Sequence, residues 1–409
     1  MAAYGAGCAL YTDLKLDVAY DPSVNSNVNA IAIQSDGKAI IAGNFTTVSG
    51  STRNYIARIN TSGTLDLTYN PNADAVAYAI AIQSDGKAII GGGFTTVSGS
   101  SRNYIARINT DGVVDLTYNP NASSDVYGAA IQSDGKAIIG GLFTTIGGVT
   151  YNRIARINTT GTADATYNPN ANGTVRSVAI QSDGKAIIVG DFTTVSGSTR
   201  NGIARINTSG TLDLTYNSGN GATSTTVVNG IALQLDGKAI IVGQFSDFSG
   251  SGLRGVARVN TDGTRDVTYN PFTNNGSTLY SVAIQSDGKA IIGGDFTTVS
   301  GSTRARIARI NTDGTLDTDY NPTVNNFVQA VAIQSDGNAI IGGAFTTASL
   351  FARSRIARIN ASGSVVTLRA PYTLPTVQVP KYAVLTLEKV PATTPSSSGE
   401  WWVINSNAS

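Results

Sequence analysis

Short apolar runs separated by turn residues make up most of the chain. In the first copy of this pattern the runs are Ala30–Gln34 and Lys38–Gly43, and the loop between them is Ser35-Asp36-Gly37. A three-residue loop that ends in glycine is typical of a β-hairpin, because glycine adopts the left-handed backbone conformation without a Cβ clash. The pattern therefore predicts two antiparallel strands joined by a tight turn.

A second hairpin follows in the same unit. Its strands are predicted at Ile56–Asn60 and Leu65–Tyr69, with Thr61-Ser62-Gly63 as the loop. The last strand ends at Asn70-Pro71, because proline has no N–H to donate to a sheet. Each unit thus holds four short strands, which is the content of one β-propeller blade.

The unit recurs seven times, and an aspartate in its first turn marks each copy. Successive marker aspartates are separated by 49, 49, 49, 53, 51 and 49 residues. A nearly fixed period built from short strands and turns is typical of propellers. We therefore predict an all-β fold, a seven-bladed β-propeller of four-stranded antiparallel blades. The marker residues are Asp36, Asp85, Asp134, Asp183, Asp236, Asp287 and Asp336.

Charged and aromatic positions also repeat in the second hairpin. Arg58 lies opposite Asp66 across the three-residue loop, and opposite charges placed in this way contribute about 0.2–1 kcal/mol to a strand pair. Their repetition favours a structural pair in each blade over a ring of ligand-binding arginines. Packing between blades likewise explains the recurrent tyrosines better than a sugar-binding platform. The pairs are Arg58–Asp66, Arg107–Asp115, Arg156–Asp164, Arg205–Asp213, Arg258–Asp266 and Arg309–Asp317, and the tyrosines are Tyr69, Tyr118, Tyr167, Tyr216, Tyr269 and Tyr320.

The seventh unit lacks a part that the N-terminal region supplies. Arg358 is present, but Val366 stands where its acidic partner belongs. Residues Leu16–Pro22 repeat the pattern of Leu65–Pro71 one period earlier. We predict that a strand in 16–22 completes the last blade and closes the ring, which hides sheet edges that promote aggregation.

Composition narrows the range of partners. The 409 residues carry 13% charged side chains and a net charge of +1, so no basic surface for nucleic acid is expected. No apolar stretch is long enough for a transmembrane helix, and no membrane insertion is expected. A surface rich in Ser, Thr, Asn and Gly suits an extracellular protein. Residues Met1–Asp13 lack the features of a signal peptide. This combination of an extracellular type of surface and no signal peptide has three explanations: a virion protein released by lysis, a cytoplasmic protein, or a chain trimmed of its signal.

The side chains that usually perform catalysis are scarce. The chain has no histidine, which removes the commonest general base and metal ligand, and its one cysteine, Cys8, excludes an internal disulfide. Most aspartates already stand at turns or opposite arginines. We therefore expect no enzyme activity, no catalytic residue, no metal site and no cofactor.

Variation between the copies indicates where a ligand binds. The hairpin tips scarcely change, whereas the links between blades and the residue after the paired glycines do change. In an up-and-down blade the tips lie on one face and the varied segments on the other. Because binding residues often lie in varied loops on a rigid scaffold, we predict ligand contacts on the varied face. The candidate residues are Asn44, Asp191, Gln244 and Asp295.

Residues 371–409 depart from the repeat. Spaced prolines are followed by predicted strands at Tyr382–Val390 and Glu400–Asn405, and the second strand holds both tryptophans of the chain. Tryptophan is a favoured interface anchor, so this hairpin is predicted to dock on a partner rather than fold back onto the propeller. The docking candidates are Trp401, Trp402, Tyr382 and Leu385. The chain then divides into an N-terminal segment (1–15), the propeller (16–370) and a linker with a docking tail (371–409).

The repeated motifs resemble a known family. The run Ala-Ile-Gln-Ser-Asp-Gly-Lys-Ala-Ile-Ile-x-Gly, followed by Ile-Ala-Arg-Ile-Asn-Thr-x-Gly-x-x-Asp, is similar to the delta-60 repeat of bacterial surface proteins and some phage proteins. The resemblance covers residues 16 to about 363 and implies a β-propeller. It supplies no catalytic residue to carry over to this chain.

Three functional hypotheses follow from the sequence. The first is a structural or adhesive virion component, most plausibly of a phage, located in the virion or outside the cell and attached to other virion or surface proteins through its tail. The second is a secreted or surface binding module that recognises a glycan or a protein of a host surface. The third, an enzyme with acidic residues in its central channel, is disfavoured by the absence of histidine and by the uniform repeats.

Overall fold

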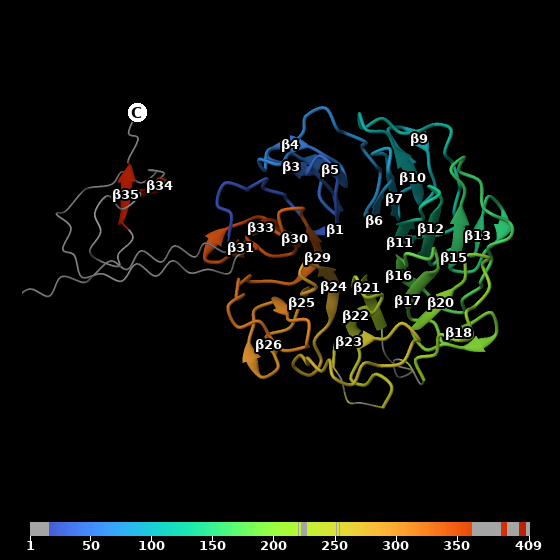
Figure 1. Ribbon diagram of the computed structural model, residues 1–409. Coiled ribbons are helices and arrows are strands. Elements are labelled where there is room, and N and C mark those ends of the chain that lie inside the picture. The colour runs from blue at the N-terminus through green and yellow to red at the C-terminus, as the bar shows by residue number, and fades with distance from the viewer. Residues whose placement is uncertain are drawn as a thin grey trace, which may run out of the picture. The chain divides into compact units, whose positions relative to one another are not determined.

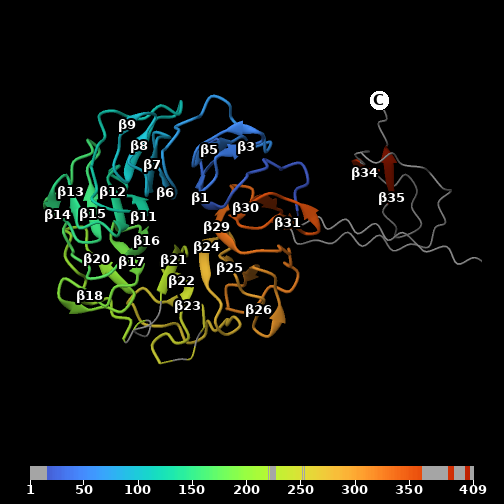
Figure 2. The same ribbon diagram turned by 180° about the vertical axis from the view of Figure 1, so that it is seen from behind.

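The computed structural model describes residues 16–219, 221, 227–250, 252 and 254–361, together with the strands at 386–390 and 401–405. The chain forms two compact units, Thr12–Val365 and a second one made of Met1–Tyr11 with Val366–Ser409. The described residues of the first unit form a ring of seven β-sheets, visible from both sides in Figures 1 and 2. No helix of the described residues is long and apolar enough to cross a membrane.

Each blade contains a three-stranded antiparallel sheet with its first strand at the centre of the ring (Figure 1). The inner strands are β1 (Val28–Ile33), β6 (Ala77–Ile82), β11 (Val126–Ile131), β16 (Val175–Ile180), β21 (Val227–Leu233), β24 (Leu279–Ile284) and β29 (Val328–Ile333). The middle strands are β2 (Ala39–Gly43), β7 (Ala88–Gly92), β12 (Ala137–Gly141), β17 (Ala186–Gly190), β22 (Ala239–Gln244), β25 (Ala290–Gly294) and β30 (Ala339–Gly343). The outer strands are β5 (Ile56–Ile59), β10 (Ile105–Ile108), β15 (Ile154–Ile157), β20 (Ile203–Ile206), β23 (Val256–Val259), β28 (Ile307–Ile310) and β33 (Ile356–Ile359).

In six blades the segment of chain that connects the middle strand to the outer strand forms a short hairpin, which the sequence did not predict. Its two strands hold only two residues each, too few to show an alternating pattern. The pairs are β3–β4 (Thr47–Val48, Ser51–Thr52), β8–β9 (Thr96–Val97, Ser100–Ser101), β13–β14 (Thr145–Ile146, Val149–Thr150), β18–β19 (Thr194–Val195, Ser198–Thr199), β26–β27 (Thr298–Val299, Ser302–Thr303) and β31–β32 (Thr347–Ala348, Phe351–Ala352).

The core of the propeller lies between blades. The middle strands are buried at almost every residue, because the two faces of each inner sheet pack against neighbouring blades. This explains why their sequences are continuous apolar runs rather than alternating ones. One cluster joins Ile40 of the first blade to Ile90 of the second, and another joins Ile340 of the seventh blade to Ile41 of the first. The ring is therefore continuous, as the sequence predicted.

The N-terminal region closes the ring in the predicted place. Leu16 forms an antiparallel bridge with Ile359, and the Asp17 N–H donates to the Arg358 carbonyl at 2.8 Å. The Asp17 carboxylate also pairs with the Arg358 guanidinium. Tyr20 is fully buried, with its ring centroid 4.6 Å from the guanidinium carbon of Arg358. Residues 16–20 thus supply the acidic partner and the buried tyrosine that the seventh repeat lacks.

The fourth strand of each blade is shorter than the sequence predicts. Leu65 makes a single bridge to Ile59, and the chain then turns instead of continuing as a strand to Tyr69. The cause is the Asp66 carboxylate, which accepts hydrogen bonds from the N–H and the hydroxyl of Thr68 at 3.0 and 2.7 Å. This local turn competes with the sheet ladder.

The repeated arginine joins each blade to the next. Arg58 Nε donates to Asp66 at 2.9 Å, and its guanidinium carbon lies 4.3 Å from the centroid of the buried Tyr69 ring. Its Nη1 donates to the carbonyl of Thr110 in the second blade at 2.6 Å. The same stacking recurs in all seven blades. The structural role predicted for these arginines and tyrosines is confirmed.

The second unit contains one antiparallel hairpin. Strand β34 (Thr386–Val390) pairs with β35 (Trp401–Asn405), so that Thr386 faces Asn405 and Val390 faces Trp401. The hairpin predicted for the tail is thereby confirmed. The docking candidates Tyr382 and Leu385, and the N-terminal segment 1–15 with Cys8, lie outside the described residues. Docking through Trp401 and Trp402 stays a prediction.

Candidate functional site

A β-bulge in every inner strand places one varied residue at the axis of the propeller. In the first blade Val28 pairs with Gly43 and Ala30 pairs with Ala42, so Asn29 is an extra residue without a partner in the register. Bulges re-aim side chains and are common next to functional sites. The seven extra residues are Asn29, Tyr78, Tyr127, Arg176, Asn229, Tyr280 and Gln329, and we call them the channel ring.

A repeated glycine makes room for the bulge. A Cβ on Gly141 would lie 2.1 Å from the carbonyl oxygen of Asp125, just before the bulge at Tyr127. The equivalent Gly43 and Gly190 would each place a Cβ 2.0 Å from a carbonyl of the neighbouring strand. Glycine often marks such a close backbone approach in a strand. The second glycine of the repeat is therefore explained by the close approach of the backbone carbonyl that precedes each bulge.

The channel ring lines one cavity of about 250 Å³ on the axis. All seven members contribute to its wall, and each comes from a different blade. They stand near the start of the inner strands, beside the links and away from the hairpin tips. The cavity therefore opens toward the varied face predicted from the sequence.

Aromatic contacts order part of the ring. The Tyr78 and Tyr127 rings are 5.1 Å apart and tilted by 52°. The Tyr280 ring lies 5.8 Å from that of Phe327, which precedes the seventh inner strand. Aromatic pairs at these separations are favourable. Flat apolar surfaces thus stand on opposite arcs of the ring, in blades two and three and in blades six and seven.

Polar contacts hold three of the other four members. Asn29 donates to the Asn44 side chain at 2.8 Å, and Asn229 donates to the Leu279 carbonyl at 2.8 Å. Arg176 makes two bonds to the carboxylate of Asp191, at 2.7 and 2.8 Å. A bidentate pair of this kind fixes orientation as well as charge. The one cation of the ring is thereby neutralised.

The tyrosines of the ring are neutral at ordinary pH. Burial, with the nearby charge of Asp125 and the hydrogen bond from the Tyr127 hydroxyl to it, raises the pKa of Tyr127 to about 12. Burial and Asp125 raise the pKa of Tyr78, and burial and Asp295 raise that of Tyr280. These hydroxyls therefore serve as hydrogen-bond donors and acceptors and not as bases.

The four residues that the sequence predicts as ligand contacts lie in two places in the structure. Asn44 and Asp191 stand behind the channel ring and hold Asn29 and Arg176. Asp295 accepts a hydrogen bond from the N–H of Thr278 at 2.5 Å, beside Tyr280. Three of the four candidates are thus next to the ring. Sequence reasoning missed the ring itself, although the second position of each inner strand varies more than its neighbours.

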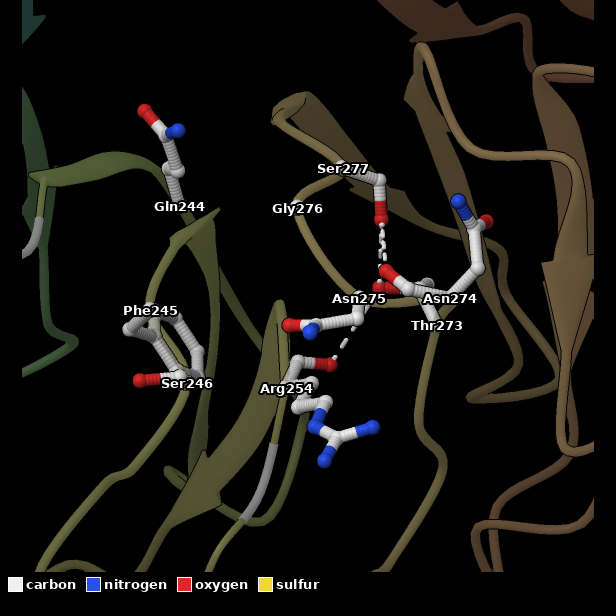
Figure 3. Close-up of a pocket in the computed structure, with 9 residues that line it drawn as sticks. All are labelled: Gln244, Phe245, Ser246, Arg254, Thr273, Asn274, Asn275, Gly276 and Ser277. Atoms are coloured by element: carbon white, nitrogen blue, oxygen red, sulfur yellow. Dashed lines mark hydrogen bonds between the residues drawn. The ribbon is translucent and has the colours of Figure 1, made fainter.

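Gln244, the fourth candidate, lies in a separate cavity of about 240 Å³ between the fifth and sixth blades. We call it the blade-five pocket; its lining residues are Gln244, Phe245, Ser246, Arg254, Thr273, Asn274, Asn275, Gly276 and Ser277. Figure 3 shows Gln244 and Ser246 on one side and Asn275 and Ser277 on the other, with Arg254 below them. The Ser277 hydroxyl donates to the carbonyl of Asn274 at 2.6 Å, and 3.0 Å separates it from the Thr273 hydroxyl.

Comparison with solved structures shows the fold. The extracellular domain of the putative one component system BT4673 from B. thetaiotaomicron has a TM-score of 0.55 and 13% identity over 85% of this chain. The match covers only 40% of that larger domain. Virginiamycin B lyase from Staphylococcus aureus has a TM-score of 0.53, 17% identity and coverage of 85% and 97% of the two chains. The WD40 β-propeller domain of Doa1 has a TM-score of 0.55, 16% identity and coverage of 83% and 96%.

Sequence comparison identifies the family. No curated protein matches the chain. A family model described as "Domain of unknown function (DUF5122) beta-propeller" matches seven segments, namely 34–69, 83–118, 132–167, 181–216, 234–269, 285–320 and 334–365. One segment falls in each of the seven blades and begins just after its inner strand, and the segments span more than half of the residues, which confirms a β-propeller repeat family. The chain therefore belongs to the DUF5122 β-propeller family.

Proposed function

We propose that this protein is a non-enzymatic binding module that recognises its ligand at the channel ring. One observation carries the proposal: the seven bulged positions, which the fold brings together around one axial cavity, hold four residue types, namely Asn, Tyr, Arg and Gln. Structural positions of the repeat, such as the buried arginines and tyrosines, keep one residue type in every blade. The links between blades and the residue after the paired glycines vary as well, so the variation lies on the face toward which the axial cavity opens. This pattern supports selection for a ligand on that face rather than for folding.

The side chains of the ring suit a neutral glycan. Tyr78, Tyr127 and Tyr280 offer flat rings for the C–H face of a sugar and hydroxyl groups for its oxygens. Asn29, Asn229 and Gln329 add amides, which both donate and accept hydrogen bonds. Because Asp191 neutralises Arg176, a charged ligand has no unpaired partner within the ring. A glycan is therefore the ligand class that this geometry favours over a charged peptide segment.

The lack of enzyme activity is part of the same proposal. The carboxylates next to the ring are already engaged, Asp191 by Arg176 and Asp125 by the Tyr127 hydroxyl. A general base needs a free carboxylate or imidazole within reach of the proton it removes, and the chain has no histidine. We expect binding without turnover and without a metal or cofactor.

A binding experiment with neutral oligosaccharides tests the proposed function. The full chain is applied to an array of neutral glycans, and hits are measured by calorimetry with Tyr78→Ala, Tyr127→Ala and Leu235→Ala variants. Leu235 is a matched control, because it is 92% exposed at the opposite hairpin tip. We expect at least tenfold weaker binding for the two tyrosine variants and no change for the control. Absence of any hit, or hits unaffected by both tyrosine variants, would overturn the proposal.

The location and the partners are proposed separately. We propose that the propeller is displayed outside the cell on a larger assembly, such as a phage virion, and that the β34–β35 hairpin attaches it to other proteins there. The hairpin supports this because it belongs to a compact unit distinct from the propeller and carries both tryptophans of the chain. A chain ending at residue 370 should keep the melting temperature of the propeller but no longer co-sediment with particles. Normal incorporation of the shortened chain would contradict the attachment.

A further inference from the structure

The departures from the repeat gather around the blade-five pocket. The step from Val228 of β21 to Leu279 of β24 is two residues longer than the usual 49, and the extra residues lie in the link that forms one wall. The opposite wall also differs. In the described part of the fifth blade, the Asp247 carboxylate accepts the N–H groups of Gly250 and Gly252, at 3.2 and 2.7 Å, where other blades form the short hairpin. One change thus lies in the wall of the cavity, and the other lies in the segment between two of its lining residues, Ser246 and Arg254.

A paired substitution removes a side-chain hydrogen bond between the fifth blade and the link to the sixth, while the N–H of Thr273 still donates to the Arg254 carbonyl at 3.3 Å. In the first blade the Asn54 side chain donates to that of Asn72 at 2.7 Å, which ties the loop after the middle strand to the following link. The second and third blades repeat this bond at 2.7 and 2.8 Å. Arg254 and Phe272 occupy the two positions in the fifth blade, so this bond cannot form there. Both asparagines are also replaced in the sixth blade, by Ala305 and Thr323, but in the fifth blade the replacement adds a positive charge, Arg254.

The pocket presents one uncompensated positive charge. Arg254 is exposed, and among the described residues no acidic side chain forms an ion pair with it. The six equivalents of Arg58 that lie in complete hairpins are, in contrast, buried against aspartates. The other polar groups of the pocket are amides and hydroxyls, which carry no charge. The unpaired positive charge of Arg254 therefore favours an anionic ligand in this pocket.

We propose that the blade-five pocket is a second binding site for a small ligand that carries a carboxylate. The planar guanidinium of Arg254 matches the two oxygens of a carboxylate, and this bidentate pairing is stronger than a neutral hydrogen bond. The amides of Gln244 and Asn275 then bond to hydroxyl or amide groups next to the carboxylate. The cavity of about 240 Å³ is smaller than the ~300–1,000 Å³ of sites for drug-sized molecules, which limits the ligand to one residue of an acidic sugar or of a peptide end.

Three probes distinguish the sources of the carboxylate. Glucuronate represents an acidic sugar, N-acetylglycine represents a peptide C-terminus, and the methyl ester of glucuronate lacks the negative charge. Binding to the full chain is followed by NMR or calorimetry. We expect one of the two acids to bind, with an affinity that falls as salt is raised, and the ester to bind at least tenfold more weakly. Equal binding of acid and ester, or binding of neither acid, overturns the proposal.

Variants then locate the site. Arg254→Gln should weaken binding at least tenfold, and Arg254→Lys should retain part of it because the charge remains. The double variant Arg254→Asn with Phe272→Asn restores the residues of the first blade, so it should restore their side-chain hydrogen bond and abolish binding without lowering the melting temperature. Tyr78→Ala removes a channel-ring side chain and should leave binding of the acid unchanged. Wild-type affinity in Arg254→Gln would refute the site, whereas loss in Tyr78→Ala would move it to the channel ring.

Discussion

Removal of residues 1–22 should destabilise the whole propeller, because this segment completes the last blade. Leu16 is buried between the sixth and seventh blades and Tyr20 between the seventh and first, with exposed fractions of 3% and 0%. Val24, which pairs with Val48 of the first blade, loses its connection to the closing strand. Full burial of an apolar side chain contributes about 1.5–3 kcal/mol, so the two deleted side chains, Leu16 and Tyr20, stabilise the ring by about 3–6 kcal/mol as an upper limit.

That amount is a large share of the stability of a folded domain, which is typically about 5–15 kcal/mol. The unfolding entropy of a propeller of about 350 residues is about 0.7 kcal/mol/K, so we expect the melting temperature in circular dichroism or calorimetry to fall by about 4–8 °C. The deletion also uncovers the edge of β33, so aggregation on heating should increase. An unchanged melting temperature would refute the account of closure.

A single substitution at Asp17 distinguishes the contribution of apolar burial from that of the ion pair in the closing segment. Burial acts to raise the pKa of Asp17, but its hydrogen bond to Arg358 and the charge of that arginine hold the pKa below its ordinary value. Asp17→Asn removes the charge and keeps the buried apolar groups. Because both partners are partly exposed, we expect a much smaller loss than for the deletion. If Asp17→Asn were as damaging as the deletion, the ion pair rather than apolar burial would close the ring.

Two further predictions concern pH and the bulge. Burial opposes ionisation of Asp66, but hydrogen bonds from Thr68 and Arg58 lower its pKa to about 2. The ionised carboxylate therefore contributes to the stability of the fold above about pH 4, and this contribution is lost as the pH falls toward 2. Melting temperatures measured from pH 6 to 2 should show this fall, and a shallower slope is expected for Asp66→Asn; equal slopes would contradict the assignment. Gly141→Ala should lower the melting temperature more than Gly93→Ala, because its Cβ would lie 2.1 Å from a backbone carbonyl, whereas the nearest atom at Gly93 is a side-chain oxygen at 3.3 Å. A greater loss for Gly93→Ala would contradict the proposed reason for the glycine.

The sequence predicted the architecture because its information lies in repetition. Seven copies of one turn define the number of blades, and the mismatch between Arg358 and Val366 locates the closing strand at Leu16. Such evidence requires no knowledge of three-dimensional contacts. The fourth strand was overestimated, because Leu65–Tyr69 has the composition of a strand while the Asp66–Thr68 hydrogen bonds impose a turn. A competing local hydrogen bond of this kind does not alter the hydrophobic pattern.

The candidate sites were harder to predict. A bulge adds one residue to an inner strand without interrupting its apolar character, so Tyr127 reads as one more strand residue. The strand order then brings seven such residues to one axis, although 49 or more residues separate them along the chain. The blade-five pocket lies where Arg254 and Phe272 replace the asparagine pair seen in the first blade, and this correspondence is visible only after the blades are aligned in space. Of the four sequence candidates, Gln244 alone marked that pocket.

The bulge at the start of each inner strand also makes the propeller a scaffold for engineering. A bulged side chain takes no part in strand register and does not belong to the apolar clusters between blades, so we expect its replacement to leave the fold intact. Members on opposite arcs of the channel ring share no contacts, and the energetic effects of well-separated substitutions usually add. A library that randomises only these seven codons could therefore be screened for new ligands while every core position is kept constant.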